Sequence, residues 1–145
     1  MKHTIRFIAL LCCLSSFSLN AQTGDMPTVH GYWEGSWSID FSYNIYLETD
    51  ANGKVTGTIT WSLSRFDPNT QETVESNPKE FVEGTYNNKT GALYLKTVKE
   101  EDPHNELMPG VYYLKMMESG AEMKGYTDGY SESAKIPITM SRMRT

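Results

Sequence analysis

The feature that most constrains this chain is a two-residue alternation of apolar and polar side chains, which recurs from Tyr32 to the end. The segment 54–63 is the clearest example, because Val55, Ile59 and Trp61 alternate there with threonine and serine. Successive side chains of a β-strand point to opposite faces, so this pattern predicts strands with one buried and one solvated face. After the N-terminal segment, no helical period of 3.6 residues persists beyond about one turn. The sequence therefore predicts an all-β fold.

Turn signals divide this pattern into eight strands joined in sequence. Asn52-Gly53 indicates a two-residue hairpin, because both residues tolerate the positive φ that such a turn needs. Residues 87–91 and Ser119-Gly120 mark two further turns. Eight such strands can form an up-and-down barrel or a sandwich, and the barrel is favoured because closure removes exposed sheet edges. We therefore predict an eight-stranded antiparallel up-and-down barrel.

The N-terminal segment has the layout of a secretory signal peptide. Lys2 and Arg6 precede an apolar run at 7–19, and the small residue Ala21 stands before Gln22. The apolar run covers 13 residues, which is short of the ~20 that a membrane-spanning helix needs. Basic start, short apolar core and small residue at the cleavage position together predict an exported protein.

Removal of a signal peptide over residues 1–21 would leave residues 22–145 as an exported bacterial protein, periplasmic or secreted. Both cysteines, Cys12 and Cys13, lie in the removed segment, so the exported part would be free of disulfides. A chain of this length buries roughly 65–70% of its unfolded surface. We therefore expect residues 22–145 to form a single β-barrel domain around one core.

Charge restricts the partners that this domain can bind. Residues 22–145 carry 18 acidic and 11 basic side chains, a net charge of −7. Such a surface repels the phosphates of nucleic acids and anionic lipids. We therefore expect a small-molecule ligand or an envelope or extracellular protein as the partner, without nucleic-acid binding or membrane insertion of the exported part.

The connections between the predicted strands differ in length in a regular way. In an up-and-down barrel alternate connections share an end, so the three long ones, at 64–79, 99–110 and 128–134, would lie together. These segments contain nine acidic and three basic residues. Loops on a rigid scaffold are where binding usually resides, so the looped acidic end is the predicted functional end. Its acids could attract a cationic partner or calcium, or could only maintain solubility.

Candidate ligand contacts are residues whose side chains are predicted to point into the barrel, here called the inward phase of a strand, and residues at the looped acidic end. Trp61 and Leu63 lead into the connection 64–79, so they are the first candidates. Tyr86 and Tyr112 share the inward phase, and His104 lies among the acids of the connection 99–110. The alternative is that the aromatic side chains are core, because a small barrel needs large side chains to fill it.

Residues with catalytic or metal-binding chemistry are sparse. His30 and His104 are the only histidines in 22–145, and they lie far apart along the chain. The motifs of serine hydrolases, phosphate-binding loops and zinc proteases are absent. We therefore expect a protein that is not an enzyme and that holds no metal or cofactor.

Two sets of residues resemble a known superfamily. Gly31-x-Trp33 on the first predicted strand with Arg142 on the last resembles the Trp and Arg pair of lipocalin and calycin barrels. The segment 52–58 is similar to the second hairpin of avidin-type barrels, members of the same superfamily. The resemblance implies a lipocalin-like exported barrel for an apolar or amphipathic molecule, with Trp33 and Arg142 closing the blunt end. The long first loop of lipocalins and the biotin-clamping tryptophans of avidins have no counterpart here.

Two functions are consistent with these observations. The first is a non-enzymatic binding protein that takes a small apolar or amphipathic ligand at the looped acidic end. The alternative is a protein-interaction module, such as a barrel-type protease inhibitor, that uses the acidic loops as its surface. A filled barrel interior would favour surface recognition.

Overall fold

A computed structural model describes residues 25–38, 41–128 and 135–144, and they contain nine β-strands. The strands are β1 (Gly31–Ser38), β2 (Phe41–Thr49), β3 (Lys54–Asp67), β4 (Glu72–Ser76), β5 (Lys79–Asn87), β6 (Ala92–Glu101), β7 (Val111–Met116), β8 (Glu122–Thr127) and β9 (Ile136–Arg142). No helix that could cross a membrane occurs in these three ranges. The predicted signal peptide, residues 1–21, and most of the predicted connection 128–134 lie outside them.

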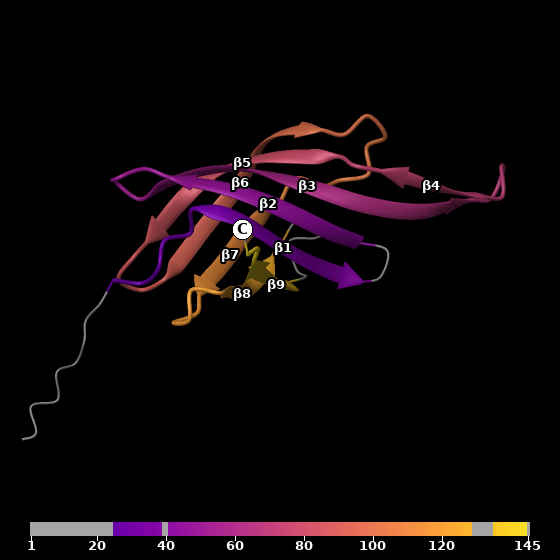
Figure 1. Cartoon of the computed structure of the whole chain (residues 1–145). Coiled ribbons are helices and arrows are strands. Elements are labelled where there is room, and N and C mark those ends of the chain that lie inside the picture. The colour runs from indigo at the N-terminus through magenta and orange to yellow at the C-terminus, as the bar shows by residue number, and fades with distance from the viewer. Residues whose placement is uncertain (1–24, 39–40, 129–134, 145) are drawn as a thin grey trace, which may run out of the picture.

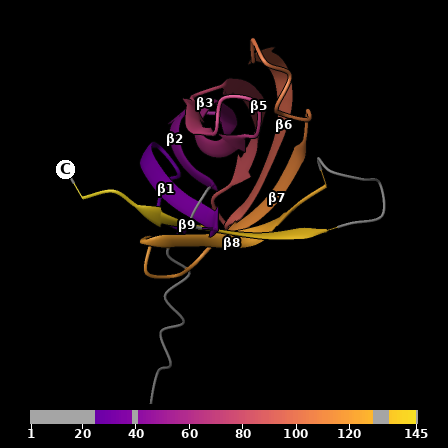
Figure 2. The ribbon, with the colours of Figure 1, turned by 90° about the vertical axis from the view of Figure 1, so that its right-hand side faces the viewer.

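Eight of the strands form a closed antiparallel barrel in which each strand pairs with the next along the chain, with β4 set aside. The ring closes where β9 pairs with β1, through Trp33 opposite Arg142 and Glu34 opposite Ser141. Figure 2 shows the strands following one another around the ring from β1 to β9. The prediction of an eight-stranded antiparallel up-and-down barrel is confirmed.

The predicted connection 64–79 is mostly a β-ribbon. β3 continues to Asp67, and β4 pairs with its second half from Leu63 opposite Ser76 to Asp67 opposite Glu72. The resulting β3–β4 ribbon, residues 64–76, extends beyond the barrel (Figure 1). The prediction of a loop was wrong here, because a ribbon solvated on both sides lacks the one-sided apolar pattern that reveals a strand.

A β-bulge reshapes the end of the β5–β6 pair. Val82 lies opposite Thr97, but the next residue back, Phe81, lies opposite Lys99, so Val98 is the extra residue. A bulge of this kind re-aims the side chains that follow it. The pairing then continues to Glu101, which shortens the predicted connection 99–110 to a loop over 102–110.

The inward side chains of the barrel pack into one continuous core. Its apolar members are each at most 8% exposed and come from all eight barrel strands, from the segment before β1 and from the loop 102–110. Three polar side chains, Glu80, Thr97 and Thr127, are buried with them. Close packing of this kind fills the space between the strands, so the barrel is built around side chains.

Tight turns and the segment before β1 close one end of the barrel, here called the hairpin end. The turns at 50–53, 88–91 and 117–121 lie there. The segment 26–30 crosses this end, with Met26 N donating to Asn88 O at 2.6 Å and Val29 fully buried. The hairpin end is therefore sealed by the chain itself.

Arg142 fastens that segment to the barrel. Its guanidinium carbon lies 4.2 Å from the centroid of the Trp33 ring, which is a cation–π contact. Its two terminal nitrogens donate to His30 O, at 2.8 Å, and to Thr28 O. Its Nε donates to Gly120 O at 2.9 Å. The pair that the resemblance placed at the blunt end thus lies at the hairpin end.

Candidate functional site

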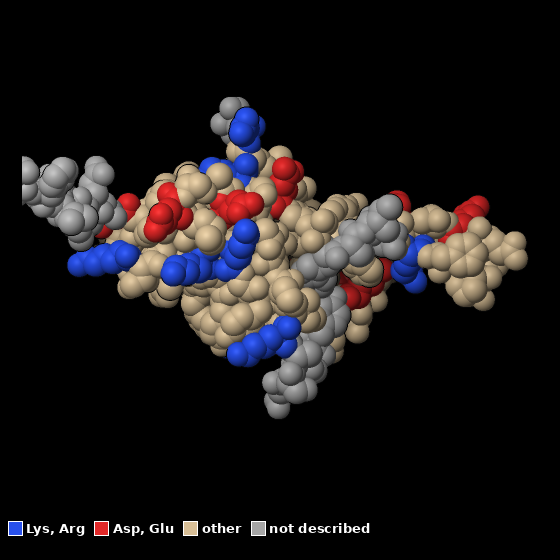
Figure 3. All heavy atoms as spheres, turned by 90° about the horizontal axis from the view of Figure 1, so that it is seen from below, with Lys and Arg blue, Asp and Glu red and all other residues tan. Residues whose placement is uncertain are grey.

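The looped end of the barrel lies opposite the hairpin turns and is formed by the β3–β4 ribbon, the last residues of β6 and the loop 102–110. Figure 3 shows the ribbon extending to one side of the barrel body, with basic and acidic side chains close together near its base. Arg65 of the ribbon donates from Nε to Glu106 Oε1 of the loop at 3.1 Å. Ribbon and loop are therefore braced against each other.

The loop 102–110 is fixed to the barrel by its own polar groups. The Leu107 N–H donates to Asp102 Oδ2 at 2.6 Å, and the Leu107 side chain is buried in the core. The Gly110 N–H donates to Thr97 Oγ1 at 3.2 Å. Asp128 Oδ1 similarly accepts the N–H of the first residue of β7 at 3.1 Å. Asp102 and Asp128, two acids of the predicted looped acidic end, thus fix the backbone of the loop 102–110 and of the start of β7.

A buried carboxyl group lies beneath this loop. Glu80 at the start of β5 is 1% exposed and points into the barrel. Its oxygens accept hydrogen bonds from Trp61 Nε1 at 2.8 Å and Thr97 Oγ1 at 2.5 Å. The Tyr112 hydroxyl lies 3.0 and 3.1 Å from the two carboxyl oxygens. Three strands therefore converge on one acidic side chain.

The environment of Glu80 changes its acidity. Burial raises the pKa of the Glu80 carboxyl above its ordinary value, and the hydrogen bonds from Thr97, Tyr112 and Trp61 oppose that rise. Glu100, which lies directly opposite Glu80 on β6, adds a like charge and raises the pKa of Glu80 further. The carboxyl group is thus held in a site that favours its neutral form.

Two further carboxyl groups at this end have buried oxygens with no hydrogen-bond donor among the described residues. One is Oε1 of Glu100, whose pKa is raised by burial and by the neighbouring Asp102. The other is Oε2 of Glu106, whose side chain is 13% exposed and whose Oε1 is bound to Arg65. Buried polar atoms normally have a partner, so these two oxygens are places where an incoming donor would be stabilised.

The five predicted ligand contacts do not lie together in the structure. It brings Trp61 and Tyr112 together around Glu80, and Leu63 is buried two residues beyond Trp61 on β3. Tyr86 lies instead at the hairpin end, where its hydroxyl donates to Pro27 O at 2.6 Å. His104 is exposed on the loop 102–110. Neither Tyr86 nor His104 reaches the carboxyl group of Glu80.

Glu80 itself was missed by sequence reasoning, although a signal was present. The alternation that leads to the turn 87–91 extends back through Gly84 and Val82, and Glu80 lies one step earlier in the same phase. A charged residue at the edge of an apolar pattern reads as the end of a strand. Here the strand continues, because buried donors from other strands satisfy the carboxyl group.

In the described ranges no group of three or more histidine, aspartate or glutamate side chains is arranged to hold a metal ion. No protein-family model matches the chain, and comparisons with curated proteins and with solved structures find no significant match.

Proposed function

We propose that this chain is an exported, non-enzymatic recognition module whose looped end binds a basic segment of a protein partner. The observation that carries the proposal is the pair of buried carboxylate oxygens without a donor, on Glu100 and Glu106. A lysine or arginine side chain supplies the donors and the positive charge that such oxygens accept best.

The packed interior supports recognition at the surface. Inward side chains are at most 8% exposed and form one cluster, and Leu107 of the loop 102–110 is part of it. A ligand of drug size needs a pocket of about 300 Å³ or more, and entry into this barrel would require the fastened loop to move away. A partner that binds across the looped end needs only side-chain movement that uncovers the buried oxygens of Glu100 and Glu106.

Exposed apolar side chains at the same end support a protein partner. Phe66 on the ribbon is 64% exposed and Met108 on the loop 102–110 is 53% exposed. The ion pair between Arg65 and Glu106 holds these two elements together. Aromatic and methionine side chains are enriched at protein interfaces, and a basic partner residue beside an apolar one would complement both features.

A small amphipathic ligand with a cationic or hydrogen-bonding head group is the second candidate. The cluster of Glu80, Trp61 and Tyr112 favours it, because a carboxyl group whose pKa is raised by burial marks a candidate functional position. The lipocalin-like resemblance of Trp33 and Arg142 points the same way. In this case the ligand would displace Leu107 and bind above the cluster.

Isothermal titration calorimetry with synthetic peptides tests the first candidate. The peptides carry arginine or lysine beside an aromatic residue, and matched peptides carry glutamine in place of each basic residue. We expect binding of the basic peptides only, weakening as salt is added. The double variant Glu100→Gln with Glu106→Gln should weaken it by about tenfold, whereas Glu118→Gln at the hairpin end should not.

Two results would oppose this proposal. Absence of binding across the basic peptides is one, and an equal loss in the Glu118→Gln control is the other. Tryptophan fluorescence, to which Trp61 contributes, tests the second candidate when it is titrated with a long-chain amine and with the alcohol of equal length. A saturable change with the amine that is lost in Glu80→Gln would favour the small ligand over the peptide.

A further inference from the structure

A row of tyrosines crosses the outer face of the barrel on the side of β6, β7 and β8. Tyr94 lies opposite Tyr113, and Tyr113 lies opposite Tyr126. The ring centroids of Tyr94 and Tyr113 are 5.4 Å apart with a 61° tilt, and those of Tyr113 and Tyr126 are 5.0 Å apart and stacked at 27°. Tyr94 and Tyr113 are each 39% exposed. The rings therefore form a continuous aromatic strip that faces solvent.

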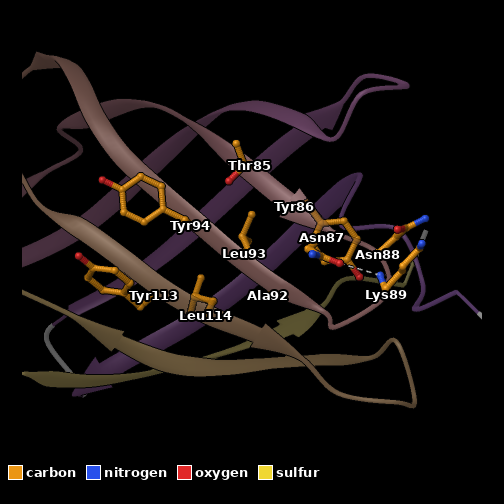
Figure 4. Close-up of a pocket in the computed structure, with 10 residues that line it drawn as sticks. All are labelled: Thr85, Tyr86, Asn87, Asn88, Lys89, Ala92, Leu93, Tyr94, Tyr113 and Leu114. Carbon is orange, nitrogen blue, oxygen red and sulfur yellow. Dashed lines mark hydrogen bonds between the residues drawn. The ribbon is translucent and has the colours of Figure 1, made fainter.

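An open hollow of about 700 Å³ adjoins this strip. The Tyr94 and Tyr113 rings border it on one side, and the turn 87–89 borders it on the other. Figure 4 shows the two rings side by side, with their hydroxyl groups pointing away from that turn. Thr85 and Ala92 line the hollow between the two rings and the turn. The surface thus combines ring faces with hydroxyl and amide groups over a shallow depression.

Lysines accompany each tyrosine of the row. On the same strand and face, Lys96 lies two residues after Tyr94, Lys115 two after Tyr113 and Lys124 two before Tyr126. The ammonium nitrogen of Lys135 lies 4.6 Å from the centroid of the Tyr126 ring.

Among the described residues, three acids lie on this face or at its edge. Glu122 pairs with Lys124 at 3.0 Å, and Asp128 Oδ1 accepts a backbone N–H. Glu83 on β5 lies opposite Lys96 and pairs with Lys54 at 3.9 Å. Among the described residues, Lys96, Lys115, Lys124 and Lys135 outnumber these three acids by one, on a chain with an overall excess of acids.

We propose that this tyrosine row and its lysines bind an acidic polysaccharide, as a site separate from the looped end. The C–H faces of sugar rings are apolar and slightly positive, so they pack on the negative face of an aromatic ring. Carboxylate groups on the sugars meet the lysines. The tyrosines lie opposite one another on three successive strands, so they form an extended surface. Such a surface suits a linear polymer better than a closed pocket would.

A second tyrosine pair has similar ring stacking but lies beside acidic residues. Tyr32 and Tyr46 on β1 and β2 have ring centroids 4.6 Å apart, but the Tyr46 hydroxyl donates to Glu48 at 3.3 Å. Glu34 lies two residues from Tyr32 on the same face. Cross-strand aromatic pairs stabilise sheets, which accounts for this second pair. The acids beside it would repel an anionic polysaccharide. It supplies the matched control.

Single-stranded nucleic acid is the competing occupant, since bases also stack on aromatic side chains beside basic residues. In the row, Tyr113 and Tyr126 already stack on each other. This pair leaves no gap into which a base could insert, whereas Tyr94 and Tyr113, each 39% exposed, still offer ring surface and hydroxyl groups to a sugar.

Native gel electrophoresis tests the site. One gel contains polygalacturonate, a second contains neutral dextran, and a third experiment adds single-stranded DNA to the protein. We expect polygalacturonate alone to retard the protein, with retardation falling as salt is added. Tyr113→Ala and Lys115→Gln should each weaken the apparent affinity by about threefold to tenfold, and Tyr32→Ala should leave it unchanged. Circular dichroism checks that each variant is folded.

Each other outcome overturns the proposal. Absence of retardation by polygalacturonate removes the site, and equal retardation by dextran removes the role of the lysines. Retardation that survives both Tyr113→Ala and Lys115→Gln places binding elsewhere. DNA binding that depends on the same two residues, at equal or higher affinity, replaces the polysaccharide with a nucleic acid. None of these results depends on the peptide assay of the looped end.

Discussion

The substitution Glu80→Gln tests how the barrel tolerates a buried acid. Glu80 is 1% exposed and accepts hydrogen bonds from three side chains. Glutamine has nearly the same shape, retains an acceptor oxygen for Trp61 and Tyr112, and cannot ionise. The comparison therefore isolates the effect of the charge on the free energy of unfolding.

The direction of the effect follows from the raised pKa of Glu80. A folded state that holds the carboxyl group neutral binds its proton more tightly than the unfolded chain does. The stabilisation from Glu80 is therefore complete below the unfolded pKa and is lost as pH rises through the folded pKa. Between these two values the stability of the wild type should fall relative to Glu80→Gln, by at most about 1.4 kcal/mol for each pH unit.

Urea unfolding followed by tryptophan fluorescence between pH 4 and pH 8 measures this difference. Trp61, one of three tryptophans in the chain, donates directly to Glu80, so the total emission includes a probe at the site. Glu83→Gln is the matched control, because Glu83 lies on the same strand, is exposed and makes only a 3.9 Å ion pair with Lys54. Glu80→Ala should cost at least about 2 kcal/mol at every pH, since its hydrogen bonds are lost and a cavity is left.

A difference between wild type and Glu80→Gln that is constant over this pH range would refute the reasoning. So would a wild type that gains stability over Glu80→Gln as pH rises, because that result means a lowered pKa. Glu100 is present in both proteins, so its own raised pKa largely cancels in the comparison.

Three further predictions concern the two ends of the barrel. Gly53→Ala should destabilise the protein by more than about 1 kcal/mol in urea unfolding, because φ is +78° and the added Cβ would lie 2.6 Å from Tyr86 O. Arg142→Lys should increase hydrogen exchange across residues 26–30, since lysine cannot hold the hydrogen bond to His30 O together with the one to Thr28 O; unchanged exchange would contradict the fastening role. Replacing residues 66–74 of the ribbon by a two-residue turn should change the unfolding free energy by less than about 1 kcal/mol, because β4 pairs only with the end of β3; a large loss would show that the ribbon supports the barrel.

Local pattern was sufficient to predict the class and order of the barrel. The alternation through Val55, Ile59 and Trp61 reports one buried face of a strand, and Asn52-Gly53 encodes its hairpin within two residues. Both signals depend on neighbours along the chain, so the sequence alone contains them. The ribbon 64–76 was missed for the same reason, because no buried face marks it.

The candidate site depended on distant parts of the chain. Trp61, Glu80, Thr97 and Tyr112 meet only because β3, β5, β6 and β7 close on one another, and the bulge at Val98 sets Glu100 opposite Glu80. The row of outer tyrosines likewise depends on strand register, which a shift of one residue would destroy. By itself, the sequence determined where strands and turns form, because φ preference and side-chain alternation are local. Only the tertiary structure decided which polar groups are buried together, because the pKa and partners of a side chain depend on what packs around it.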